Sequence, residues 1–213
     1  MAARTQSLSG DTTLVLPEFD TPPQDPYPLM RAWLDSAVAR EVREPYAAVL
    51  ATADRSGRAS SRVLLIKEID DRGLQFTSFQ GSRKGQELAG TPWGSLTFYW
   101  RETLQQLTVQ GPVEVLTGPE SDELFARRPL AAQATTAISR QSRPLDDEAA
   151  LKAGAKALAA DGGPVPRPDE WTGYRLVPQA IEFWYGSPDR LHRRLRYDRG
   201  AETSGWAHQR LQP

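Results

Sequence analysis

The sequence contains no cysteine, and it has only two histidines, His192 and His208, in 213 residues. The absence of cysteine excludes disulfides, thiolate nucleophiles, Cys-ligated zinc and iron–sulfur clusters. We expect no metal site, because two histidines supply too few ligands. No apolar run is long enough to cross a bilayer, and the polar N-terminus lacks the apolar segment of a signal peptide. We therefore expect a cytoplasmic protein that does not enter a membrane.

Several short catalytic fingerprints are also missing. The chain has no G-x-G-x-x-G, no P-loop, no H-E-x-x-H and no G-x-S-x-G. Its formal net charge is −1, from 26 basic and 27 acidic residues, which argues against a nucleic-acid-binding protein because such proteins carry a broad basic surplus. If the chain is an enzyme, we expect a bound organic cofactor to supply the reactive group.

Alternating hydrophobic patterns predict a strand-rich chain with helices between the strands. Residues 1–24 are polar and proline-rich, so we expect a flexible N-terminal arm followed by one domain over residues 25–213. Helical spacing or capping residues predict helices over residues 25–42, 82–90, 119–127, 131–141 and 146–160. Period-two alternation predicts strands over residues 47–54, 59–69, 74–79, 95–100 and 104–116, with three or four more near the C-terminus. This order predicts a mainly β, α+β fold, an antiparallel barrel or sheet with packed helices.

The segment Ile181–Arg199 concentrates cations and aromatic residues beside a turn. We expect a β-hairpin whose connection is residues 186–189. Alternation then places four basic side chains on one face: Arg190, His192, Arg194 and Arg196. Like charges side by side on a strand repel, so such a row is either splayed into water on an edge strand or neutralised by an anion such as phosphate or carboxylate.

Three further groups of basic residues accompany this hairpin. Arg62 and Lys67 lie at the ends of an apolar strand that we expect to be buried, so both need partners. Arg83 and Lys84 begin a predicted helix, where backbone N–H groups and two cations favour a phosphate, although many surface helices begin in the same way. The basic pair at residues 127–128 fits either an anion site or solvated charges at a helix end.

Two pairs of polar residues and one tryptophan fit a flat ligand that forms hydrogen bonds. Gln105 and Gln106 interrupt an apolar strand, and Gln141 and Ser142 close a predicted helix. A buried amide needs both a donor and an acceptor, which either a heterocycle or the protein's own polar groups can supply. Trp184 either covers such a ring or packs in the core or at an interface.

Taken in order, these segments resemble the flavin-dependent pyridoxamine/pyridoxine 5′-phosphate oxidase family. The resemblance spans roughly residues 25–213 and depends on the common order and spacing of the motifs, since each alone is weak. The matching motifs are RVLLIK (62–67), FTSFQGSRKGQEL (76–88), LFARRP (124–129), SRQS (139–142), PVPRPDEWTGYRL (164–176), IEFWYG (181–186) and RLHRR (190–194).

This resemblance implies a split β-barrel that binds FMN at the interface of a homodimer, with each site drawing on both chains. The cofactor contacts that it implies are Arg62, Val63, Leu64, Leu65, Ile66, Lys67, Thr77, Ser78, Arg83, Lys84, Gln106, Gln141, Ser142, Trp184 and Arg194. Among them, Arg62, Arg83 and Lys84 are the side-chain types expected around a phosphate dianion.

The resemblance also implies the substrate side of the site, with two departures. The substrate contacts that it implies are Lys67, Arg128, Arg190 and His192, and the last two face the reacting substrate as the catalytic pair. In the vitamin oxidases a tyrosine and a serine also bind the substrate phosphate, but Leu124 and Ala132 occupy these positions here. The loss of both hydroxyls weakens phosphate binding by about a hundredfold or more.

These departures, together with PEFDTPPQDP (17–26) and VREP (42–45), resemble the phenazine-biosynthesis branch of the family. This resemblance implies an FMN-dependent oxidase that passes a hydride from a reduced phenazine carboxylic or dicarboxylic acid to flavin N5, with O2 as the reoxidant. His192 either accepts a proton in this reaction or only positions a carboxylate. The alternatives are a vitamin-phosphate oxidase and a split-barrel protein that binds flavin without turnover.

Overall fold

The computed structural model describes residues 9–200 and 205–213. Its helices are the 3-10 helix η1 (Pro17–Phe19) and the α-helices α1 (Pro26–Ala39), α2 (Arg83–Gly90), α3 (Gly118–Ala126), α4 (Leu130–Ile138) and α5 (Glu148–Ala160). Its strands are β1 (Ala47–Ala53), β2 (Ala59–Leu65), β3 (Glu68–Asp70), β4 (Gly73–Phe79), β5 (Trp93–Trp100), β6 (Gln105–Val115), β7 (Trp171–Leu176), β8 (Ala180–Tyr185), β9 (Arg193–Arg199) and β10 (Trp206–Leu211).

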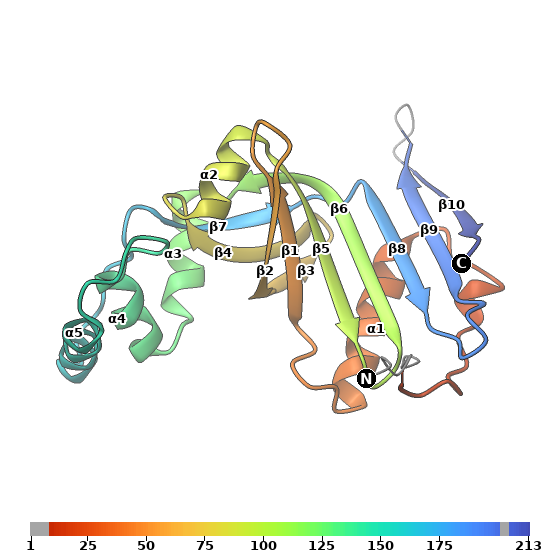
Figure 1. The fold of residues 1–213 in the computed structure, drawn as a ribbon, viewed down its shortest axis with the longest axis horizontal. Coiled ribbons are helices and arrows are strands. Elements are labelled where there is room, and N and C mark those ends of the chain that lie inside the picture. Colours follow the sequence, from red (N-terminus) through yellow and green to blue (C-terminus); the bar gives the residue numbers. More distant parts are fainter. Residues whose placement is uncertain (1–8, 201–204) are drawn as a thin grey trace, which may run out of the picture.

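The strands of the described chain form one curled, antiparallel sheet of ten strands. One path across the sheet runs β10-β9-β8-β6-β5-β1-β2, and β7, β4 and β3 branch from it at β6. Figure 1 shows α1 lying against the part of the sheet that contains β6 and β8, whereas α3, α4 and α5 gather at the opposite end of the molecule. The prediction of a mainly β, antiparallel split barrel with packed helices is confirmed.

Strand β6 joins the two parts of the sheet. Its residues 105–110 pair with β8, whereas residues 113–115 pair with β7. At the change of partner the chain of residue 177 passes very close, and a Cβ atom on Gly111 would lie 1.9 Å from the carbonyl oxygen of Val177. Only glycine allows this approach of two backbones, so Gly111 fixes where the sheet divides.

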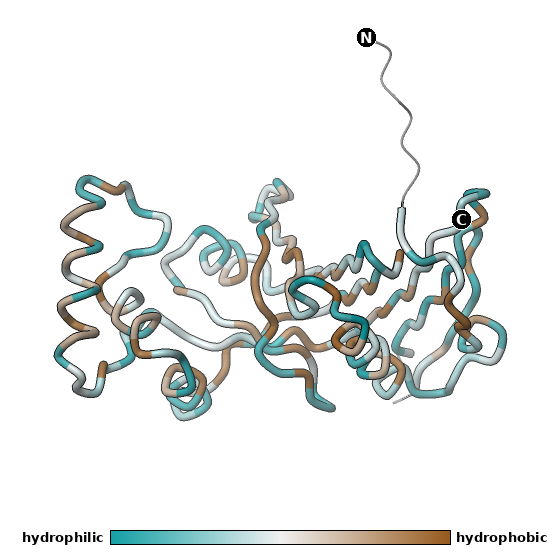
Figure 2. Tube along the Cα trace, turned by 90° about the horizontal axis from the view of Figure 1, so that it is seen from below, coloured by the Kyte–Doolittle hydropathy of each residue, from teal (hydrophilic) through white to brown (hydrophobic). Residues whose placement is uncertain are grey.

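The core lies between the inner face of the sheet and α1. Leu50, Leu96 and Val109 are fully buried neighbours on β1, β5 and β6, because alternation points all three to the same face. Helix α1 covers this face, and the ring of its Trp33 lies 5.0 Å from the ring of Phe183 in an edge-on arrangement. Figure 2 shows hydrophobic positions running along the central strands, while loops at the extremities are largely hydrophilic.

Strand β2 departs from the expectation that its apolar sequence is buried. It ends the path across the sheet, with β1 as its partner among the described strands. Val63 and Leu65 point away from the core and are 67% and 50% exposed. The expectation is wrong for this face because α1 covers only the inner side of the sheet, and no element of the described chain covers the outer side of β2.

The hairpin of β8 and β9 is present, but its connection is longer than expected. Strand β9 begins at Arg193, so the connection covers residues 186–192 and contains Arg190 and His192. Arg190 has a φ of 67°, which interrupts the extended backbone. The predicted row of four cations on one strand face is therefore wrong, and only Arg194 and Arg196 share the strand.

Part of the expected N-terminal arm packs on the domain. The indole Nε1 of Trp33 donates a hydrogen bond of 2.5 Å to the buried Glu18 carboxylate, and the Tyr185 hydroxyl donates to the carbonyl of Asp11 at 3.0 Å. Arg193 forms an ion pair of 2.7 Å with Asp20. These contacts hold residues 11–20 against α1 and the C-terminal strands. Residues 1–8 of the expected arm lie outside the described residues.

Side-chain caps begin the helices where the sequence predicts them. Asp25 accepts a hydrogen bond from the amide of Tyr27 at the start of α1, and Ser82 accepts one from the amide of Gly85 at the start of α2. Helix α1 ends at Ala39, before the predicted residue 42, and the chain beyond it turns through a positive φ at Glu41. Among the described residues, no helix is long and apolar enough to cross a membrane.

The contact at Gly111 leads to a prediction about stability. A G111A substitution forces the backbone of Val177 to move, so we expect the free energy of unfolding to fall by about 1–3 kcal/mol. The matched control is G118A, because a Cβ atom on Gly118 meets no atom within 4 Å. Urea denaturation followed by tryptophan fluorescence measures both variants. Equal stabilities of the two variants would contradict the role given to Gly111.

Candidate active site

The N-terminus of α2 holds a buried lysine among neutral oxygen atoms. Lys84 is 8% exposed, and its Nζ donates to Ser78 Oγ at 2.9 Å and to Gln141 Oε1 at 3.2 Å. Burial, and then the positive charge of Arg62, lower the pKa of Lys84 below its ordinary value. No carboxylate of the described chain lies within ion-pair distance of this ammonium group. A buried cation without an acidic partner favours a bound anion.

Glu87, one turn further along α2, connects the two arginines of this cluster. Its carboxylate accepts from Arg83 Nε at 2.9 Å and forms an ion pair of 3.3 Å with Arg62 Nη2. Thr52 and Ser60 also donate to it, at 2.5 and 2.7 Å. Burial raises the pKa of Glu87, but these hydrogen bonds together outweigh burial and lower the pKa to about 2. Glu87 is therefore ionised at neutral pH and fixes where both arginines lie.

A second group of predicted cofactor residues lies on the outer face of β6, β8 and β9. Gln106 is the cross-strand partner of Trp184, and Trp184 is the partner of Arg194, so the three form one row. Arg194 already has an acidic neighbour, because its Nη2 lies 2.8 Å from Glu182 Oε1. Trp184 is partly exposed on this face, which leaves its ring surface accessible. Across the three strands, the row therefore places an amide, a flat aromatic ring and a guanidinium next to one another.

These two groups lie on opposite faces of the same sheet. Arg62 is opposite Leu50, which belongs to the buried inner face. Gln106 is next to Leu107, which is also buried, so alternation points Gln106 to the outer face. One chain therefore does not bring the group around Lys84 and Arg62 together with the group around Trp184 and Arg194.

A third group contains the predicted substrate cations. Lys67 is exposed, but partial desolvation and then the charge of the nearby Arg128 lower its pKa. Arg128 Nη2 donates to Thr136 Oγ1 at 2.9 Å, and its guanidinium carbon lies 5.2 Å from the centre of the Trp171 ring. Its Nε is buried and forms no hydrogen bond with the described chain. Leu124 is also buried near this arginine's helix end, with an exposure of 8%. The group brings two cations near each other, and Leu124 packs in the adjoining hydrophobic cluster with Phe125 and Trp171.

The loop between β8 and β9 carries the predicted catalytic pair. Arg190 is exposed, and His192 is partly buried with its ring centre 4.8 Å from that of Trp184. The amide of Ser187 donates a hydrogen bond of 3.0 Å to His192 Nδ1. His192 therefore adjoins the second group of cofactor residues, as the sequence predicts for a substrate residue next to the cofactor.

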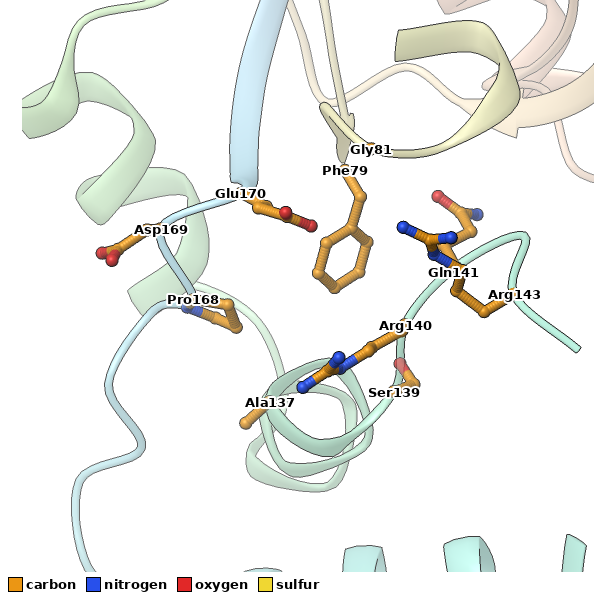
Figure 3. A pocket seen from close by; sticks show the side chains of 10 residues that line it. All are labelled: Phe79, Gly81, Ala137, Ser139, Arg140, Gln141, Arg143, Pro168, Asp169 and Glu170. Carbon is orange, nitrogen blue, oxygen red and sulfur yellow. The ribbon is translucent and has the colours of Figure 1, made fainter. Parts of the chain in front are cut away.

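A pocket of about 320 Å³ lies beside Gln141. Figure 3 shows Phe79 between Glu170 on one side and Gln141 on the other, with Arg140 below them. The pocket adjoins the Lys84 group, because Gln141 belongs to both. No residue of the row Gln106, Trp184 and Arg194 lines it, so this pocket does not unite the two groups.

The remaining predicted cofactor residues lie on or next to β2, on β4 and in the turn after α4. Leu64 and Ile66 turn to the inner side, while Val63 and Leu65 turn outward beside β1. Thr77 precedes Ser78 on β4 and is partly exposed. Ser142 is exposed, and its Oγ accepts a hydrogen bond of 3.4 Å from the amide of Arg83.

Two residues at the site are missed by the sequence analysis. Glu87 lies four positions after Arg83, and this spacing on a helix is a recognisable signal for an ion pair. Its contacts with Thr52 and Ser60 come from another hairpin and have no local signal. Thr136, which holds Arg128, shows no pattern in the sequence that points to this contact.

Comparison with known proteins shows which protein family the chain matches. Residues 34–160 match a family model described as pyridoxamine 5′-phosphate oxidase, and residues 171–213 match one described as the pyridoxine 5′-phosphate oxidase C-terminal dimerisation region. The chain is 46% identical over 211 residues to the dihydrophenazinedicarboxylate synthase of Burkholderia lata, with 99% of each chain covered. It is 44% identical over 208 residues to the protein of the same name from Pseudomonas chlororaphis, covering 98% of this chain and 93% of that one.

Vitamin oxidases are nearly as similar in identity. The pyridoxine/pyridoxamine 5′-phosphate oxidase of Burkholderia vietnamiensis is 44% identical over 200 residues, with 93% of each chain covered. Among solved structures, PhzG from Burkholderia lata in complex with tetrahydrophenazine-1-carboxylic acid superposes with a TM-score of 0.92 at 46% identity, covering 96% of this chain and 100% of that one. Identity alone therefore does not separate the two activities.

The network around Glu87 leads to a prediction about pH. The pKa of Glu87 in the folded chain is about 2, below its ordinary 4.5, so its contribution to stability is present above about pH 4.5 and is lost as the pH falls toward 2. We expect E87Q to lower the free energy of unfolding at pH 7 by about 1–3 kcal/mol, and the difference from the parent chain to shrink as the pH falls through this window. Urea denaturation at several pH values measures it.

The matched control for this prediction is E123Q. Glu123 pairs with Arg127 at the same four-residue spacing, but both side chains are exposed. We expect a change of less than about 0.5 kcal/mol at any pH, because exposed ion pairs contribute little. A pH-independent loss in E87Q, or an equal loss in E123Q, would show that the ionised Glu87 carboxylate does not hold the cluster.

Proposed function

The chain belongs to the pyridoxamine 5′-phosphate oxidase family, and from this premise we propose that it is an FMN-dependent oxidase of reduced phenazine carboxylic or dicarboxylic acids. Two relatives named dihydrophenazinedicarboxylate synthase support the proposal, and the alignments cover 93% and 99% of their lengths. The similar Burkholderia lata structure, which is a complex with tetrahydrophenazine-1-carboxylic acid, also supports it. Its product is the more oxidised, aromatic phenazine acid.

The observation that carries this proposal is the composition of the substrate pocket. Lys67 and Arg128 retain the cations that bind an anionic substrate group, but Leu124 and Ala132 replace the two hydroxyl-bearing residues expected around a phosphate. The guanidinium of Arg128 is held by Thr136 and by the face of Trp171. Two cations without the two hydroxyl donors suit a carboxylate on a flat ring system better than a phosphate, which needs more donors.

The residues of the first group fit the phosphate of FMN. Lys84 is a buried cation without a carboxylate partner, and Arg83 is 66% exposed on its side chain and lies at the same helix start. Glu87 holds Arg62 and Arg83 in place but supplies only one negative charge for two arginines and Lys84. A phosphate dianion balances the remaining positive charge. In the second group, Trp184 and Gln106 fit the flat ring and its amide edge.

The opposite placement of these two groups supports a site shared between two copies of the chain. Their residues lie on different faces of the sheet, so a single chain supplies only one group to any one cofactor. The exposed apolar face of β2, with Val63 and Leu65, offers a surface for a second copy. The match of residues 171–213 to a dimerisation region agrees with this arrangement. We therefore propose a homodimer with FMN at the interface.

In this proposal the protein orients the substrate and the cofactor supplies the redox chemistry. FMN, if bound as proposed, would supply the hydride acceptor for the substrate, with O2 as the proposed reoxidant. Arg190 and Arg128 bind substrate carboxylates, and His192 lies beside Trp184, next to where the flavin ring is expected. Orientation is the main contribution of the chain, since a reduced phenazine loses hydrogen readily.

The proposed activity is tested by anaerobic titration of the purified protein's visible spectrum. We expect a reduced phenazine carboxylic acid to bleach the flavin absorbance, with full recovery on admission of air. Pyridoxine 5′-phosphate serves as the competing substrate, because vitamin oxidases are nearly as similar to the chain in identity. Faster bleaching by the vitamin would assign the chain to that activity, and no bleaching by either would leave a flavin-binding protein without turnover.

The shared site is tested by mixed dimers purified through two different affinity tags. A dimer of one R83A chain and one R194A chain has both defects in one site and leaves the other intact, so we expect about half of the wild-type FMN content. A dimer of one R62A chain and one R83A chain has one defect in each site and serves as the control, with little FMN. Equal FMN in the two mixed dimers would contradict a site built from both chains.

A further inference from the structure

The loop between β8 and β9 is held in one shape by its own hydrogen bonds. Asp189 accepts from the Ser187 hydroxyl and, at 2.9 Å, from the amide of Leu191. The amide of Arg190 donates to the carbonyl of Ser187 at 3.1 Å, which closes a tight turn. The amide of Gly186 donates to the carbonyl of Leu104 at 2.9 Å and anchors the loop to the chain before β6. These bonds fix the backbone on both sides of the turn.

This backbone fixes the protonation pattern of His192. The amide of Ser187 lies 3.0 Å from Nδ1 of His192 and donates a hydrogen bond to it. A backbone amide is always a donor, so Nδ1 must keep its lone pair to accept this bond. The proton of the neutral imidazole therefore sits on Nε2. The reverse ring orientation would place a carbon atom against the amide and leave this donor unpaired.

The acidic residue whose charge interacts with the ring is Asp189, on the same loop. No carboxylate of the described chain lies within ion-pair distance of His192. Asp189, the acidic residue of the same loop, uses its carboxylate for Ser187 and Leu191. On its other side the ring meets Trp184, at 4.8 Å between ring centres. A proton on Nδ1 would turn both this atom and the Ser187 amide into donors facing each other, which costs the hydrogen bond.

We infer that Ser187 locks His192 into the tautomer that carries hydrogen on Nε2, so that His192 donates a hydrogen bond to a substrate carboxylate and does not accept the substrate's proton. The inference concerns the same site as the proposed function and rests on it for the identity of the substrate. Of the two roles open for His192 in the sequence, base or positioning group, the loop geometry points to positioning.

The tautomer is measured without any substrate. Nitrogen-15 NMR of protein labelled at histidine distinguishes a protonated ring nitrogen from an unprotonated one, and the chain has only two histidines to assign. An H208Q variant identifies the signals of His192. Above pH about 7.5, where an ordinary histidine is neutral, we expect Nε2 protonated and Nδ1 unprotonated. An S187A variant keeps the backbone amide and is expected to show the same tautomer.

Activity of two isosteric variants tests the role. Glutamine places an amide nitrogen near the position of Nε2, whereas asparagine places one near Nδ1. We expect H192Q to keep the substrate Kd within about fivefold of the parent, and H192N and H192A to weaken it by about 10- to 100-fold, the effect of one hydrogen bond to a charged group. The limiting rate of anaerobic flavin reduction is expected to change less than the Kd in all three.

The outcomes separate this inference from the proposed function. A proton on Nδ1, or a doubly protonated ring at that pH, would overturn the lock whatever the substrate proves to be. A normal Kd with a strongly reduced limiting rate in H192Q would make His192 a base. If no phenazine acid reduces the flavin, the proposed function fails, but the NMR result still decides the tautomer.

Discussion

The alternation of side chains across one sheet is the constraint on which the site depends. The inner row that includes Leu50 and Leu96 must be buried, and its register fixes which face every neighbouring residue occupies. Arg62 is thereby committed to the inner side, and Gln106 with Trp184 to the outer side. A cofactor that needs both sets of groups can be held only where the two faces of different chains meet. In the proposed dimer, the same geometry that builds the core therefore leaves each copy with only one of the two groups at a given cofactor.

Charge is organised differently on the two faces. On the outer face, Arg194 and Arg196 are paired with Glu182 and Asp198, so these two strand arginines are neutralised within the chain. On the inner side, Lys84 is buried among neutral oxygens, and Glu87 is shared by two arginines. Net positive charge therefore collects around the start of α2. The outer face contributes shape and hydrogen bonding more than charge.

Much of the fold follows from local patterns. Asp25 and Ser82 begin helices because their side chains satisfy free backbone amides, and this chemistry is visible in the sequence. Strands β1, β4, β5 and β6 follow from period-two alternation, but the single strand predicted over residues 59–69 is divided into β2 and β3, and β3 pairs with β4. The apolar sequence of β2 has two interpretations, since burial by the same chain and exposure at an edge require the same residues. The packing of Glu18 under Trp33 has no local signal, because it joins a polar segment to a distant helix.

The sequence by itself determined the residue types at the site, the strand-rich architecture and the replacement of two hydroxyls by Leu124 and Ala132. These are properties of composition, spacing and motif order, so no coordinates are needed to read them. Only the tertiary structure decided that Arg190 and His192 lie on a loop, that Glu87 joins two arginines, and that the amide of Ser187 meets Nδ1 of His192. Each of these depends on the distance and direction between groups brought together by folding, which spacing along a chain does not specify.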